Sequence, residues 1–325
     1  MDHRPLGSSR GLMHPTGDSP ASTLNQRRVA IGWAGILAPM PYLVLKVNWT
    51  LGGDVGITDP DLLTDPVYRL ADGFTIGAEL VAIAITLAMT RQFGQRLPAW
   101  LVLVPMWVAT GLLAVIVVLA PLAAPFAVSD SAARAGLEGW VYLLVYAGFV
   151  AQGVLLLWAF ALYARTRWGH LQLPPPAEAG SALRAVAVVT GVACATLGVC
   201  YWCWSLGLAE PTVKPSGVDR VTLAVYGGFA FAAAASIHTF TRERATSTSR
   251  RYAVLGLWVA TSAMTTWGGY YLALAAWHPS LASPFLVFAA VAKIALSAGI
   301  AVLALGLLTT QARRPPKPRE IAPLR

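Results

Sequence analysis

Charged residues are scarce in this chain. Of its 325 residues only 12% are Asp, Glu, Lys or Arg, while 56% are hydrophobic, whereas about a quarter of a soluble domain is charged. The three cysteines are too few to hold together a small secreted scaffold by disulfides. This composition argues against a water-soluble globular enzyme and indicates an integral membrane protein.

The common catalytic and metal-binding signatures are also missing. The chain has no His-Glu-x-x-His, no Gly-x-Ser-x-Gly and no phosphate-binding loop. His238 and His278 fall near opposite ends of successive predicted helices, so they cannot ligate one haem iron. We therefore predict no cofactor, no metal site and no catalytic residue.

Long apolar runs fill most of the sequence. A helix needs about 20 apolar residues to cross the hydrocarbon core of a bilayer, and eight runs come close to or exceed this length. They extend from Val29 to Val47, Gly73 to Thr90, Ala99 to Leu119, Trp140 to Tyr163, Ala185 to Leu206, Val221 to Phe240, Tyr252 to Trp277 and Phe285 to Thr309. The runs are continuous rather than alternating, so they predict an all-α polytopic membrane protein with eight transmembrane helices.

The basic residues indicate the orientation. With the N-terminus inside, 18 of the 24 Lys and Arg residues fall in the inner segments. Basic residues concentrate in the cytoplasmic loops of membrane proteins, so we expect a multi-pass protein of the plasma membrane with both termini in the cytoplasm. The net charge of +9 is then a topology signal, and we predict no nucleic-acid partner.

The chain divides into two similar halves. Asn48-Trp49-Thr50-Leu51-Gly52 at the end of the first span is echoed 155 residues later by Cys203-Trp204-Ser205-Leu206-Gly207. The predicted organisation is a disordered cytoplasmic tail (1–28), a four-helix membrane half (29–168), a cytoplasmic linker (169–184) containing Pro174 to Pro176, a second four-helix half (185–309) and a cytoplasmic tail (310–325). Two units with an even number of spans face the same way, so the halves are expected to be parallel repeats.

The Trp-x-Leu-Gly-Gly motif from Trp49 to Gly53 resembles a group of uncharacterised small four-helix bacterial membrane proteins of actinobacterial type, here duplicated. The resemblance covers Tyr42 to Gly56 and its partial echo at Tyr201 to Gly207. In the echo, Leu208 replaces the second glycine. Because the group has no assigned activity, the resemblance implies topology only.

Two charges fall deep within predicted spans. Glu79 and Lys293 lie about 10 and 13 Å below the outer ends of their helices by the rise per residue, so they could pair across the bundle. Lys46 lies nearer the outer surface and could join them or extend to the interface. One interpretation is an outward-facing polar cavity that binds a ligand, and the other is a structural ion pair that docks the two halves.

Two further features accompany these charges on the first span. Pro39 and Pro41 in the middle of the helix predict a kink or break, which can expose carbonyls to a substrate or merely shape packing. Trp49 belongs to a group of aromatic residues at the outer face, which is typical of an interfacial belt but could also stack on a lipid, quinone or sugar. The following segment holds Asp54, Asp59, Asp61, Asp65 and Asp72, interpreted either as a solvated acidic loop or as a site that attracts cations.

The sequence leaves several functions open. The leading hypothesis is transport or binding of a small or amphipathic molecule, with the lipid bilayer as the main partner and a small-molecule or lipid ligand. The alternatives are a membrane-embedded enzyme, with Cys200 and Cys203 as a thiol-redox pair, and a non-catalytic scaffold or accessory subunit.

Overall fold

The computed structural model describes residues 20–134, 136–169, 181–209, 215–242, 246–277, 279 and 282–312. In this part of the chain the protein is all-α, with a single isolated β-bridge between Ile57 and Leu137. The elements are α1 (Pro20–Leu37), α2 (Met40–Thr50), the 3-10 helix η1 (Pro60–Leu63), α3 (Pro66–Thr90), the 3-10 helix η2 (Gln92–Gln95), α4 (Ala99–Arg134), α5 (Gly139–Trp168), α6 (Ser181–Leu206), α7 (Gly217–Thr241), α8 (Ser247–Trp277) and α9 (Pro284–Ala312).

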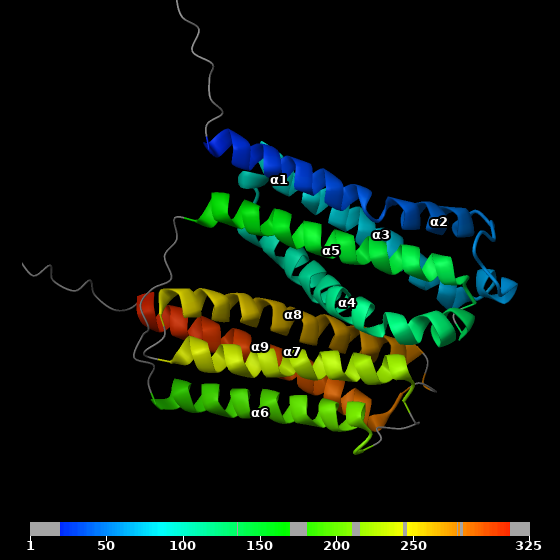
Figure 1. Ribbon diagram of the computed structural model, residues 1–325. Helices are drawn as coiled ribbons and strands as arrows, with labels where there is room; N and C mark the ends of the chain where they lie inside the picture. The colour runs from blue at the N-terminus through cyan, green and yellow to red at the C-terminus, as the bar shows by residue number, and fades with distance from the viewer. Residues whose placement is uncertain are drawn as a thin grey trace, which may run out of the picture.

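The long helices run side by side and alternate in direction (Figure 1). The start of α1 and the end of α9 lie at the same end of the bundle, which we call the terminal end. The loop between α2 and α3 lies at the opposite end, which we call the loop end. This up-and-down arrangement is the simplest one for consecutive helices joined by short connections.

The helices form two groups of four. In the first, α1 packs on α3 and α5, and α4 packs on α3 and α5; in the second, α6 packs on α7 and α9, and α8 packs on α7 and α9. Only α4 joins the groups extensively, through α7 and α8. We call α1 to α5 the first half and α6 to α9 the second half; the predicted tandem repeat and its origin by duplication stay predictions.

Within the described residues, seven helices are long and apolar enough to cross a membrane: α1 with α2, α3, α4, α5, α6, α7 and α9. The eighth expected span corresponds to α8, which has 31 residues and is not among the seven. Helix α8 contains more polar residues and is packed between α4, α7 and α9. Thr261, Ser262 and Thr266 hydrogen-bond to carbonyls of their own helix, so these side chains need no other partner.

The predicted interruption of the first span is confirmed. Helix α1 ends at Leu37 and α2 begins at Met40. Proline has no N–H, so Pro39 and Pro41 cannot donate to the carbonyls four residues earlier. A Cβ atom added to Gly148 of α5 would lie 3.3 Å from the Ala38 carbonyl oxygen, so α5 covers the break closely and the break shapes packing.

The ends of the chain differ in part from the expected boundaries. Helix α1 begins at Pro20, so residues 20–28, expected in a disordered tail, are helical. Residues 1–19, the prolines at 174–176 and residues 313–325 lie outside the described residues.

The contact between α4 and α8 joins the halves. A Cβ atom on Gly111 would lie 2.3 Å from the Ser262 carbonyl oxygen, so the two backbones meet where α4 has no side chain. The indole N–H of Trp267 donates to the Gly111 carbonyl at 3.1 Å, and the indole of Trp258 donates to Thr110 at 3.3 Å. Small residues and interhelical hydrogen bonds of this kind hold membrane helices together.

Candidate functional site

Lys46 of α2 forms a buried ion pair with Asp72 of α3. The side chains of both residues are 8% exposed. The ammonium also lies over the rings of Tyr42, Trp49 and Tyr68, with Nζ to centroid distances of 5.2, 5.1 and 5.4 Å. Ring faces attract cations, so one carboxylate and three aromatic rings compensate the buried charge.

Local structure at the loop end holds this cluster in place. The Trp49 indole donates to the Val55 carbonyl at 2.9 Å, which pulls the loop back onto α2. Tyr68 lies on the first turns of α3, and partial burial together with the nearby Asp72 raises the pKa of its phenol to about 12. The phenol therefore stays neutral at physiological pH, and Lys46 lies over the face of its ring.

Glu79 lies two helical turns along α3 from Asp72 and is 5% exposed. Its Oε2 accepts a hydrogen bond of 2.7 Å from Nε2 of Gln152 on α5. Gln152 is 3% exposed, and its Oε1 has no hydrogen-bond donor in the described part of the chain. A carboxylate and an amide therefore face each other in the interior of the first half.

The expected pairing of Glu79 with Lys293 is wrong. Glu79 contacts Gln152 within the first half, whereas Lys293 lies in the second half on α9, over aromatic rings of that half. Among the described residues, the recorded ion pair is that of Lys46 with Asp72. The reason is the architecture, because each half closes its own ring of helices and α3 and α9 belong to different rings.

Lys293 is 3% exposed. Its Nζ lies 4.2 Å from the ring centroid of Tyr226 on α7 and 5.5 Å from that of Tyr201 on α6. No carboxylate of the described residues lies within ion-pair distance of it. The second half therefore holds an ammonium stabilised by ring faces alone.

Among the described residues, the first cluster has a carboxylate beside its lysine and the second does not. Tyr201 lies 155 residues after Lys46, and Trp204 lies 155 residues after Trp49. The second cluster thus uses an aromatic residue where the first has its lysine, and α9 supplies the lysine instead. The partner carboxylate Asp72 has no counterpart, since the position 155 residues later is Gly227.

Sequence reasoning did not identify Tyr68, Gln152 and Tyr226 as partners of the buried charges, and it placed Asp72 in the acidic loop rather than beside Lys46. Asp72 was detectable, because it precedes Glu79 by seven residues and so lies on the same helix face. Gln152 was detectable as a lone amide in an apolar run. No sequence signal specified that Tyr68 and Tyr226 face lysines, because that depends on how the helices pack.

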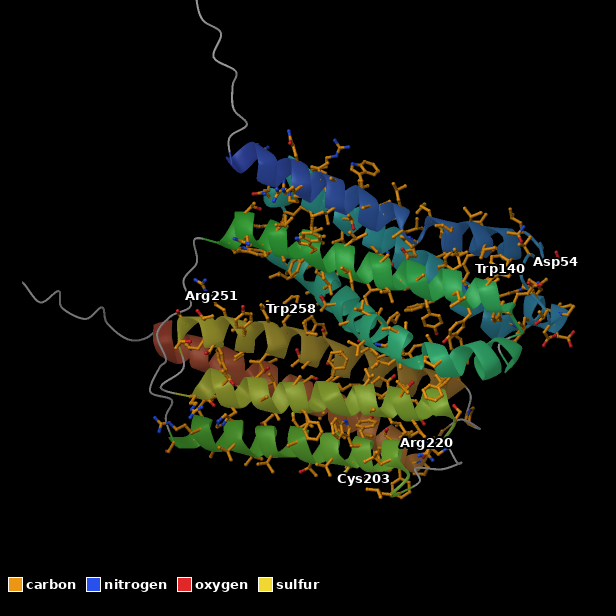
Figure 2. The ribbon with its side chains drawn as sticks, viewed as in Figure 1. Asp54, Trp140, Cys203, Arg220, Arg251 and Trp258 are labelled. Carbon is orange, nitrogen blue, oxygen red and sulfur yellow. The ribbon has the colours of Figure 1, made fainter. Side chains whose placement is uncertain are left out.

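The acidic segment is only partly a solvated loop. Asp54, Asp59, Asp61 and Asp65 are exposed, and the Asp59 carboxylate accepts from the Asp61 amide at the start of η1. Asp72, expected in the same loop, is instead buried in α3. Figure 2 shows Asp54 and Trp140 together at the loop end.

The outer aromatic residues divide into two sets. Trp140, Trp202 and Trp277 are exposed, as an interfacial belt requires. Trp49 and Tyr201 are buried at 4% and 2% exposure, so these two belong to the lysine clusters and not to a belt.

The cysteines lie along α6. Cys200 is exposed, Cys203 is half-buried and Cys194 is buried, and all three are free thiols. Figure 2 places Cys203 at the loop end near Arg220. No group of three or more His, Cys, Asp or Glu side chains suited to a metal occurs in the described residues.

Comparison of the chain with family models, curated proteins and solved structures gave no match.

Proposed function

We propose that the protein is an eight-span plasma-membrane protein that binds, and by extension transports, an amphipathic molecule carrying an acidic group. The topology proposal places both termini in the cytoplasm. It is supported by the concentration of arginines at the terminal end, where Figure 2 shows Arg251, and by the course of α8 alongside the seven apolar helices. The likeness to small four-helix bacterial membrane proteins, duplicated here, belongs to the same proposal.

The observation that carries the ligand proposal is the position of Lys293. A charge in hydrocarbon is costly and usually has a partner or a function. Lys46 has its carboxylate in Asp72, whereas Lys293 faces only the rings of Tyr226 and Tyr201 among the described residues. An acidic group brought by a ligand would complete the second cluster as Asp72 completes the first.

The surroundings of Lys293 suit an amphipathic ligand. Ala289 and Ala290 precede it on α9 and are buried with it, so Lys293 lies on the inward face of this helix beside small side chains. On the other face of α9, Phe285 and Phe288 are exposed to the bilayer. A ligand with an apolar chain would lie against this exposed face, and its acidic group would have to enter between the helices to meet Lys293.

Calorimetric titration of the purified protein in a neutral detergent tests this proposal. Laurate should bind about tenfold more tightly than dodecanol, because a hydrogen bond to a charged group adds about 1.5 kcal/mol or more. The variant Lys293→Met should bind the two probes equally. The variant Arg251→Met removes an exposed cation at the opposite end and should retain the preference.

Two results would overturn the proposal: equal affinity of the wild-type protein for laurate and dodecanol, or an unchanged preference in Lys293→Met. Either result would favour a scaffold or accessory subunit. Tyr226→Leu provides a second variant, since it removes a ring face and retains the lysine. It should keep the preference for laurate, because the ammonium remains.

A further inference from the structure

We propose that Glu79 and Gln152 form a proton-binding site in the first half, at which Glu79 exchanges a proton with water and Gln152 positions the acid form. This proposal does not depend on the ligand of Lys293. It begins from the orphaned Oε1 atom of Gln152, which is buried beside the carboxyl group and has no donor in the described part of the chain.

An ionised Glu79 cannot satisfy that atom. A carboxylate only accepts hydrogen bonds, whereas a protonated carboxyl group also donates one. In the observed arrangement Nε2 of Gln152 donates to Oε2 of Glu79 at 2.7 Å, which leaves the amide oxygen without a donor.

Protonation completes the pair. The new O–H bond on Glu79 allows the acid to donate to Gln152 Oε1 while the amide N–H continues to donate to the other carboxyl oxygen. Two antiparallel hydrogen bonds then join the two planar groups, and the charge of Glu79 changes from −1 to 0. Both effects favour the acid form in a site that excludes water.

The neighbouring charged groups do not neutralise Glu79 in place of a proton. Lys46 of α2 is paired with Asp72 of α3, and Arg28 of α1 donates to Thr166 at 3.4 Å. The described side chains of α4, from Ala99 to Phe126, include no ionisable group. The other ionisable groups on α2 and on the membrane part of α5 are phenols (Tyr42, Tyr142, Tyr146 and Tyr163), and a phenol never carries a positive charge.

A row of polar residues on α3 extends from the site toward both ends of the helix. Asp72, Glu79 and Thr86 follow one another at intervals of seven residues, which places them on one face of the helix. All three are buried. Seven residues span about 10 Å of helix, so water between these side chains would have to carry a proton from the Asp72 side to Glu79.

Infrared spectroscopy of the purified protein without ligand tests the inference. The wild-type protein should show the carbonyl band of a protonated carboxylic acid, sensitive to deuterium exchange, and Glu79→Gln should lack it. In Gln152→Met the band should move to higher wavenumber or disappear, because the acid loses its hydrogen-bond partner. Asp54→Asn, which removes an exposed carboxyl group at the loop end, serves as the control and should retain the band.

The inference fails if no acid band depends on Glu79 at any pH at which the protein is folded, or if Gln152→Met leaves the band unchanged. Should Glu79→Gln not fold, Glu79→Asp retains an acid of different geometry and should shift the band. Because the measurement uses no laurate, its failure is separate from a failure of the Lys293 proposal.

Discussion

At the scale of single residues, the buried groups Lys46, Lys293 and Glu79 have different kinds of partner. Lys46 has a carboxylate and three rings, Lys293 has two rings, and Glu79 has an amide. Because the partners differ, removing a partner should affect the stability of the protein differently at each of the three groups. The pair of Lys46 with Asp72 is the strongest case, because both members are buried.

We predict that Asp72→Asn destabilises the protein by about 3 kcal/mol, because removing one partner leaves a buried charge without its counter-charge. The free energy of unfolding in mixed detergent micelles measures this effect. Asp54→Asn is the control, since Asp54 is exposed in the same segment of the chain. Equal stability of the two variants would show that the rings alone hold the ammonium.

At the scale of elements, the ends of α2 and α6 have the same cap. The amides of Gly52 and Gly207 bond to the carbonyls of Trp49 and Trp204 at 3.0 and 3.2 Å. The next amides, of Gly53 and Leu208, reach back five residues at 2.8 and 2.9 Å. Such caps require a left-handed residue, and Gly52 and Gly207 have φ values of 88° and 74°.

We predict that Gly52→Ala costs about 1 to 2 kcal/mol of stability, the price of a left-handed conformation with a Cβ atom. A Cβ atom there meets nothing within 4 Å, so the loss would come from the backbone alone. Gly73→Ala in α3 is the matched control, because a Cβ atom there also meets nothing and alanine favours a helix. Thermal melting compares the two, and equal melting temperatures would refute the cap.

At the scale of the whole molecule, topology depends on α8. Its 31 residues extend beside α7 and α9 (Figure 1). Length and apolar composition, however, identify only the other seven described helices as membrane spans. If α8 crosses the bilayer, its two ends are on opposite sides.

We predict that single cysteines at Asp54 and Pro279 react with an impermeant maleimide in intact cells. Cysteines at Arg96 and Thr246 should react only after permeabilisation. These four residues are exposed, and Cys194, Cys200 and Cys203 are replaced by alanine beforehand. Reaction of Pro279→Cys and Thr246→Cys under the same condition would show that α8 does not cross.

The amino-acid sequence alone determined the helical class, most of the helix ranges and the break at Pro39 and Pro41. These features depend on local properties: the length of apolar runs and the missing amide of proline. The cap glycines were likewise visible in the Trp49 and Trp204 motifs, because a helix end is specified within a few residues.

Only the tertiary structure decided the partners of the buried charges. Depth along a helix placed Glu79 and Lys293 at similar levels, but depth does not specify the direction in which a side chain points around the bundle. The packing of α3 on α5 gave Glu79 its amide, and the packing of α9 on α6 together with the side chain of Tyr226 from α7 gave Lys293 its rings. Partner choice therefore required the arrangement of helices from distant parts of the chain, which no local pattern encodes.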